Sequence, residues 1–185
     1  MSYIILDRDG VINHDSSEYI KSPDEWLPIP RSLEAVAALN RAGFRVIVAT
    51  NQSGVARGYY DLETLSDIHE KMMRELAAVG GYVEEIFFCP HHPEEGCACR
   101  KPQPGMMQAI QQKYGLSLTD TFFIGDSYAD IGAAQAAGCK PILVMTGNGH
   151  LTLERHPELS VIPQFADLSD AVDYVVSQQQ PGKRR

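Results

Sequence analysis

The sequence predicts an α/β fold built on a doubly wound parallel sheet. Short apolar runs rich in β-branched and aromatic residues, such as the "RVIVA" before Thr50 and the "TFFIG" before Asp126, are typical of buried strands. Segments with helical periodicity lie between these runs, and most of them end at a glycine. Strands that alternate with helices in this way form parallel crossovers, with helices on both faces of one sheet.

The elements can be assigned in chain order. Strands are expected at residues 3–6, 45–49, 83–89, 121–125 and 141–146, and helices at 31–43, 61–81, 104–115, 128–138 and 168–180. Ser32 is the expected N-cap of the first helix, and Pro104 is expected in the first turn of the third. In the second helix, apolar residues recur at intervals of three and four, which predicts one buried face: Leu65, Ile68, Met72 and Leu76.

Composition indicates one globular domain over residues 1–185, because 44% of the residues are hydrophobic and no linker or repeat interrupts the pattern. The net charge of −8 argues against nucleic acid and anionic membranes as partners. The first ten residues do not resemble a signal peptide, and no apolar run approaches the roughly 20 residues that span a bilayer. We therefore expect a cytoplasmic monomer, with the basic "PGKRR" end as a frayed, solvated tail.

Polar residues with catalytic potential follow three of the expected strands. Asp7, Thr50 and Asp126 each stand directly after an apolar run. Because ligands of such sheets bind outside the carboxyl ends of the strands, these residues are expected to share one edge. Asp9, two residues after Asp7, adds a second carboxylate. Although Asp-Gly is also a common turn signal, paired carboxylates can hold Mg²⁺ or divide the work of nucleophile and acid/base.

The order of these residues resembles the four motifs of the haloacid dehalogenase-like phosphohydrolases over residues 4–130. The matching stretches are "LDRDG", the strand-end Thr50, Lys101, and "GDSYAD" with Asp126 and Asp130. The resemblance implies a Rossmann-like fold of that family and a covalent phosphoaspartate at Asp7. It also implies that Asp9 protonates the leaving oxygen and then activates water.

The same resemblance implies a set of charges around the phosphoryl group. Mg²⁺ would be held by Asp7, Asp126 and the main-chain carbonyl of Asp9, and Lys101 would add a further positive charge. Asp130 would orient the metal shell or the lysine, unless it is only a first-turn helix residue. Phosphoryl oxygens would be met by the Thr50 hydroxyl and by the backbone amides of the residues after it: Asn51, Gln52 and Ser53.

Three of the four cysteines lie in "CPHHPEEGCACRKP", residues 89–102. A disulfide, a redox pair or a metal site would each use such a cluster, and a reducing compartment favours the metal. In extended chain, residues i and i+2 face the same side, so Cys89 with His91, and Cys97 with Cys99, each present two ligands. These four residues predict a structural zinc site.

Neighbours of this cluster carry further expectations. His92 is the alternative nitrogen ligand, but its side chain should point away from Cys89. Cys139 stands apart from the cluster and is expected to be a buried apolar thiol. A zinc ion in this loop would fix Arg100 and Lys101, which follow it directly, so a structural metal would have a catalytic consequence.

The zinc cluster, together with "DRDGVIN" and "TNQSGVARG", resembles the family of heptose bisphosphate 7-phosphatases of bacterial heptose biosynthesis. That resemblance implies a sugar bisphosphate substrate that loses its C7 phosphate, on the route to the lipopolysaccharide core. Histidinol-phosphate phosphatases share the zinc cluster and are the alternative, although "NQSGVARG" favours the heptose enzymes.

Access to the site is expected to be open. Only about 20 residues, 11–30, separate the first motif from the first helix, so no cap domain fits there. Loops must then supply specificity, and Asp15, Arg57 and Arg100 are the candidate substrate contacts. A receiver-type signalling domain also carries an Asp phosphoacceptor on a parallel sheet, but it needs neither Asp9 nor a positioned lysine. Steady release of phosphate would distinguish the two classes.

Overall fold

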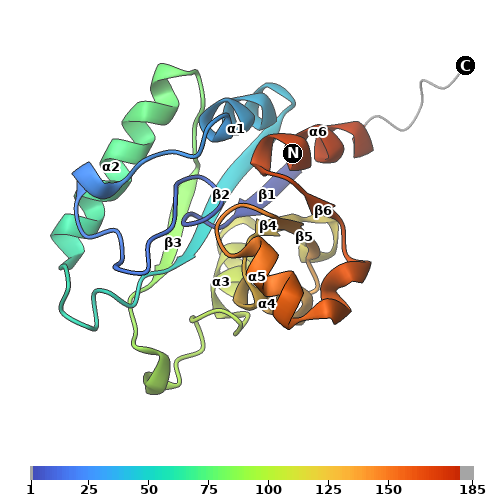
Figure 1. The fold of residues 1–185 in the computed structure, drawn as a ribbon. Coiled ribbons are helices and arrows are strands. Elements are labelled where there is room, and N and C mark those ends of the chain that lie inside the picture. The colour runs from blue at the N-terminus through green and yellow to red at the C-terminus, as the bar shows by residue number, and fades with distance from the viewer. Residues whose placement is uncertain (1, 180–185) are drawn as a thin grey trace, which may run out of the picture.

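The computed structural model describes residues 2–179 and shows one sheet with helices on both faces (Figure 1). Its six strands are all parallel, in the order β3-β2-β1-β4-β5-β6. The strands are β1 (Ser2–Leu6), β2 (Phe44–Asn51), β3 (Glu85–Cys89), β4 (Phe122–Gly125), β5 (Lys140–Val144) and β6 (Gln164–Phe165). The predicted doubly wound parallel sheet is confirmed. The expected tail at 181–185 lies outside the described residues.

The helices fall into two layers. They are α1 (Ser32–Arg41), α2 (Leu62–Ala78), α3 (Gly105–Tyr114), α4 (Tyr128–Ala137), α5 (Gly149–Arg155) and α6 (Leu168–Gln178). In Figure 1, α1, α2 and α6 lie on one side of the sheet, and α3, α4 and α5 lie on the other. The sequence did not predict α5 and β6, because seven and two residues are too short for a periodic pattern to be recognised.

The alternation of side chains along β1 explains why both faces are apolar. Ile4 and Leu6 belong to the core beneath α1, α2 and α6, whereas Ile5 packs with residues of α3 and α4. A parallel sheet covered on both faces needs apolar residues at every position, which produces continuous rather than alternating runs. The buried face of α2 is the predicted one, with Leu65, Ile68, Met72 and Leu76 in the core.

Two of the expected helix starts differ in the structure. Ser32 is the first residue of α1 and not its N-cap, because its hydroxyl donates to the Ile12 carbonyl at 2.6 Å. Arg31 occupies the cap position with a φ of 69°. Pro104 lies one position before the first turn of α3, at the cap. In both cases the entering loop, and not the local sequence alone, sets the start.

The segments that leave the carboxyl ends of the central strands are loops. Residues 7–31 contain one single-turn 3₁₀ helix, Pro23–Glu25, before α1 begins. β1 lies between β2 and β4, so Asp7, Thr50 and Asp126 reach the same edge of the sheet. Over the described residues, every helix is too short or too polar to cross a membrane.

Candidate active site and metal clasp

A pocket of about 370 Å³ opens at the carboxyl edge of the sheet. Most of the residues predicted for the site line it: Asp7, Asp9, Asp15, Thr50, Asn51, Gln52, Ser53, Arg100, Lys101, Asp126 and Asp130. The loops after β1, β2, β4 and β5 and the loop before α3 all contribute to its wall. Arg57 is the predicted contact that does not line the pocket.

Lys101 is the centre of a buried group of charges. Its ammonium lies 2.9 Å from Asp7 Oδ1 and 2.6 Å from Asp130 Oδ1, and it donates to the Ala49 carbonyl at 2.7 Å. The ammonium is therefore enclosed by two carboxylates and one carbonyl, each within 2.9 Å.

The carboxylates of this group influence one another strongly. Burial, and then the charge of Asp130, raise the pKa of Asp7 to about 7. Burial and the charges of Asp130 and Asp7 raise the pKa of Asp126 well above its usual value. Burial would lower the pKa of Lys101, but Asp130 and Asp7 raise it. Three buried carboxylates facing one ammonium leave an excess of negative charge, which is the condition that attracts a divalent cation.

Asp126 is held from the loop after β5. Its Oδ2 accepts hydrogen bonds from the Asn148 backbone amide at 2.7 Å and from the Asn148 side chain at 3.3 Å. Gly10 lets the carboxylate approach the loop after β1, because a Cβ at Gly10 would lie 2.1 Å from Asp126 Oδ2. Oxygens of Asp7, Asp126 and Asp130 all lie within 4.8 Å of one another, and oxygen ligands suit a hard cation such as Mg²⁺.

Asp130 has less capacity for a metal than its two neighbours. Its Oδ2 accepts from the Ser127 hydroxyl at 2.7 Å and from the backbone amides of Ser127 and Asp126 at 3.0 and 3.2 Å. Ser127 caps α4 and forms a reciprocal capping box with Asp130. Asp130 therefore stands in the first turn of α4 and also lies 2.6 Å from the Lys101 ammonium.

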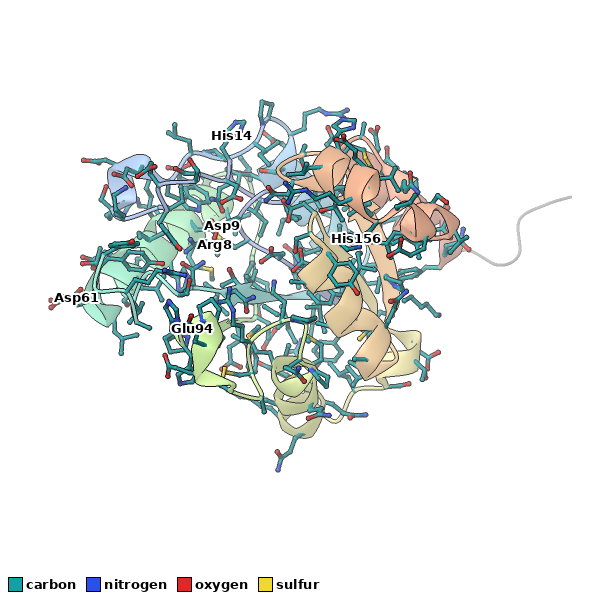
Figure 2. The ribbon with its side chains drawn as sticks, turned by 60° about the horizontal axis from the view of Figure 1, so that its bottom comes forward. Arg8, Asp9, His14, Asp61, Glu94 and His156 are labelled. Carbon is teal, nitrogen blue, oxygen red and sulfur yellow. The ribbon has the colours of Figure 1, made fainter. Side chains whose placement is uncertain are left out.

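Asp9 occupies a different environment from Asp7. Arg8, which is labelled beside Asp9 in Figure 2, donates to both of its carboxylate oxygens at 2.9–3.1 Å. Asn13 donates to Oδ1 at 2.8 Å, and Gln52 donates to Oδ2 at 2.9 Å. Arg8 is fully buried beneath this carboxylate. The Asp9 carboxylate is therefore fixed by its own set of donors, separate from the Lys101 group.

Residues after β2 divide between pocket and scaffold. Thr50 is buried, and its Oγ1 accepts from Gln52 Nε2 at 2.9 Å. The Asn51 side chain joins the Lys101 backbone through two hydrogen bonds of 3.1 Å, so it fixes the loop that carries this lysine. Ser53 is buried in the pocket wall.

The three predicted contacts at the pocket mouth differ in their surroundings. Asp15 accepts from the Asn148 side chain at 2.9 Å, and burial followed by the charge of Asp9 raises its pKa. Arg100 lines the pocket, and its Nη1 atom is buried without a hydrogen-bond partner in residues 2–179. Arg57 is exposed, with its guanidinium 6.0 Å from the centre of the Tyr19 ring, which itself lines the pocket.

The four predicted zinc ligands, which we call the clasp (Cys89, His91, Cys97 and Cys99), come together at one point. The Sγ atoms lie 3.0–3.5 Å apart, and His91 Nδ1 lies 3.2 and 3.5 Å from Cys99 and Cys89. All four cysteines of the chain are free thiols. His92 instead accepts from the Glu94 amide and caps the short turn Pro93–Glu95, outside the clasp.

This donor set fits zinc. A tetrahedral site with Zn–S bonds of about 2.3 Å places its sulfur atoms about 3.8 Å apart, slightly more than the clasp spacing. Cys89 is the last residue of β3, and Lys101 follows Cys99 by two positions, so the clasp ties the sheet edge to the lysine loop. Cys139 is buried in the apolar core, as the sequence predicted.

Sequence reasoning missed four residues of this site: Arg8, Asn13, Tyr60 and Asn148. Arg8 carried no signal, since a charged residue between two aspartates is expected at the surface. Asn148 did carry a signal in the sequence, because "TGNGH" follows the fifth apolar run at the same edge of the sheet. Tyr60, whose hydroxyl donates to Gln52 Oε1 at 2.7 Å, lies in a segment without motif.

The chain resembles known phosphatases in sequence. The HAD-hydrolase-like family matches residues 98–171. The D-glycero-β-D-manno-heptose-1,7-bisphosphate 7-phosphatase of Pseudomonas putida is 53% identical over 170 residues, covering 91% of this chain and 96% of that protein. The enzyme of the same name from Bordetella bronchiseptica is 56% identical over 153 residues, covering 83% and 86%.

A solved structure agrees with these relatives. The crystal structure of the B. bronchiseptica D,D-heptose 1,7-bisphosphate phosphatase, complexed with magnesium and phosphate, aligns with a TM-score of 0.93 at 49% identity. The alignment covers 96% of this chain and 99% of that one. The chain belongs to the D-glycero-D-manno-heptose 1,7-bisphosphate 7-phosphatase family of HAD-like hydrolases.

Proposed function

We propose that this protein is a Mg²⁺-dependent phosphatase that removes the C7 phosphate of D-glycero-D-manno-heptose 1,7-bisphosphate and leaves the 1-phosphate. The identity of the substrate is inferred from the names of the relatives reported above. The observation that carries the reaction type is the contact between Lys101 and Asp7 beside the Asp126 carboxylate. Such a group can accept a phosphoryl group on a carboxylate and neutralise the charge that gathers there.

The first half-reaction uses Asp7 as nucleophile. One of its oxygens, Oδ1, is occupied by Lys101 and by the Arg8 backbone amide, whereas Oδ2 accepts no hydrogen bond from residues 2–179. Oδ2 forms the new bond to phosphorus as the bond from phosphorus to the sugar C7 oxygen breaks. A proton from Asp9 passes to that leaving oxygen, because an alkoxide is a poor leaving group.

The second half-reaction hydrolyses the phosphoaspartate. Asp9, now deprotonated, takes a proton from the water that attacks phosphorus, and the Asp7 carboxylate is released together with inorganic phosphate. The Thr50 hydroxyl and the backbone amides of Asn51 and Ser53 donate to the phosphoryl oxygens in both steps. The Gln52 backbone amide, which was also expected there, instead donates to the Cys89 carbonyl at 2.8 Å. Arg8, Asn13 and Gln52 keep the Asp9 carboxylate in place through the proton transfers.

Two metals belong to this proposal. Asp7, Asp126 and the Asp9 main-chain carbonyl would hold Mg²⁺, whose charge offsets the repulsion between carboxylate and phosphate. That repulsion is about 4 kcal/mol per pair of unit charges at about 4 Å and an effective dielectric of about 20. The clasp would hold a structural zinc ion, which keeps Arg100 and Lys101 in position.

We also propose how the substrate is selected at the pocket and where the protein acts. We take residues 1–185 as a single capless domain, so that the pocket mouth, with Asp15 and Arg100, selects the substrate; Arg57 does not line this pocket. Arg100 is the strongest candidate for the distal phosphate, because its Nη1 is buried without a hydrogen-bond partner among residues 2–179. We further propose a cytoplasmic monomer that acts on a small sugar phosphate and not on nucleic acid, in keeping with the net charge of −8.

Steady-state phosphate release from a panel of phosphate esters tests the function. The panel holds heptose 1,7-bisphosphate, histidinol phosphate and p-nitrophenyl phosphate, and we expect the highest kcat/KM for the bisphosphate. A higher value for histidinol phosphate would move the enzyme to the alternative family branch while leaving the chemistry intact. A single phosphorylation event without turnover would instead indicate a receiver domain.

A further inference from the structure

The Gln52 side-chain amide makes three contacts inside the protein, and both of its N–H donors are used. Its Oε1 accepts from the Tyr60 hydroxyl at 2.7 Å, and its Nε2 donates to Asp9 Oδ2 and to Thr50 Oγ1, both at 2.9 Å. The side chain is almost fully buried, with 3% of its surface exposed. The amide thus joins the proposed acid/base to a proposed phosphoryl-binding hydroxyl.

An amide has two orientations, and only one works here. The flipped form would set Oε1 against the Asp9 carboxylate, which is an acceptor only when it is ionised, and two facing acceptors repel. In the observed form Gln52 donates to Thr50 Oγ1, so the Thr50 hydroxyl keeps its own proton for a ligand in the pocket. The orientation of one amide therefore affects the position of Asp9 and the donor direction of Thr50 together.

Tyr60 is built into the fold as the donor that selects this orientation. It is 7% exposed and lies in the turn before α2. Gly54 admits its ring, because a Cβ at Gly54 would lie 2.2 Å from Tyr60 Cε1. Burial raises the pKa of Tyr60 to about 12, so the hydroxyl remains a donor at any working pH.

We infer that Tyr60 is a positioning residue, which acts through Gln52 to hold Asp9 and Thr50 in their reactive orientations. The inference rests on the phosphatase function proposed above. Without the Tyr60 hydroxyl, Gln52 Oε1 is buried without a donor and the amide gains access to its flipped form. Asp9 then loses a fixed donor, and proton delivery to the leaving oxygen becomes less efficient.

The dependence of rate on the leaving group separates this role from general structural support. A good leaving group needs no proton, so a displaced acid harms only esters with poor leaving groups. In Tyr60→Phe, measured on substituted phenyl phosphates, we expect kcat/KM to fall about tenfold or more for phenyl phosphate and under about twofold for p-nitrophenyl phosphate. Rate would thus depend more steeply on leaving-group pKa than in the native enzyme.

Tyr114→Phe is the matched control. It also removes a tyrosine hydroxyl, one that donates to a partly buried acceptor, Glu85 Oε2, at 2.6 Å. Tyr114, however, lies on α3 and outside the pocket. We expect the native leaving-group dependence in this variant. If Tyr60→Phe lowers all esters equally, or none, the positioning role is wrong even though the native enzyme turns over. A native enzyme without turnover would instead refute the phosphatase function itself.

A double-mutant cycle and a spectroscopic signal test the route through Gln52. On a Gln52→Met background, Tyr60→Phe should cause no further loss, whereas additive losses would show that Tyr60 acts by another path. In the native protein, the Gln52 side-chain amide protons should exchange slowly with solvent and give sharp NMR signals. Tyr60→Phe should speed their exchange, and unchanged exchange would contradict the inference without any activity measurement.

Discussion

The Lys101 ammonium lies 2.6 Å from Asp130 Oδ1, and both side chains are buried. Burial would raise the pKa of Asp130, but Lys101 lowers it. Asp130 is therefore an anion at working pH and pairs with the same ammonium as Asp7. The first turn of α4 thus forms part of the pocket wall.

Asp130→Asn should lower kcat by roughly 10- to 100-fold. The reason is that the buried Lys101 ammonium, without its anionic partner, moves away from its place in the pocket. Asparagine keeps much of the capping geometry, so α4 should persist. Asp170→Asn is the control, since Asp170 occupies the first turn of α6 and pairs with exposed Arg31. Steady-state kinetics on both variants check the expectation. Equal activity in the two would assign Asp130 to helix capping alone.

Asp7→Asn should lose several orders of magnitude in kcat/KM, since the nucleophile and a metal ligand disappear together. Asp9→Asn should be inactive on the sugar ester but should still accept phosphate from an aryl ester with a good leaving group. Acid quenching and mass spectrometry should then find the phosphoryl group on Asp7. Trapping on another residue would overturn the assignment of the nucleophile.

Cys97→Ala should release the clasp metal and loosen the loop that carries Lys101. Zinc measured in protein purified without chelators should fall from about one ion per chain to well below one, and phosphate release should fall with it. Cys139→Ala is the control, because this buried thiol lies outside the clasp. Native protein without zinc would end the prediction.

The raised pKa of Asp7 links metal binding to pH. An aspartate whose pKa is 3.8 when unfolded and about 7 when folded binds more protons in the folded state, so stability falls as pH rises between these values. The melting temperature of metal-free protein should therefore fall from about pH 5 to about pH 8, and Mg²⁺ should raise it more at the higher pH. Asp7→Asn should flatten both trends. Thermal scans with and without Mg²⁺ measure them.

Arg100→Ala should reduce kcat/KM for the bisphosphate far more than for p-nitrophenyl phosphate, because only the former offers a second phosphate to the unpaired Nη1 atom. Arg57→Ala is the comparison, since its guanidinium lies against Tyr19 and outside the pocket wall. Parallel kinetics on both esters would show the difference. An equal loss on the two substrates would leave Arg100 as support for the lysine loop.

The gathering of these site residues at one edge of the sheet could be predicted, because it follows from topology. Asp7, Thr50 and Asp126 stand directly after apolar runs, and parallel strands bring their ends to one side whatever their distance in sequence. The same logic failed for Arg8, whose burial depends on partners, Asp9 and the surrounding core, that no local pattern reveals. Ser32 shows the other limit, since a carbonyl twenty residues earlier decides the fate of its hydroxyl.

The position of β1 between β2 and β4 has a consequence for synthesis. A growing chain that has emerged through residue 89 holds β1, β2 and β3, but the edge of β1 that pairs with β4 is still open. Asp7 then lacks Asp126, and the nascent chain carries an unpaired strand edge of the kind that invites aggregation. We expect ribosome-bound chains to become protease-resistant only after β4 has left the exit tunnel, because residues 122–125 cover the open edge of β1.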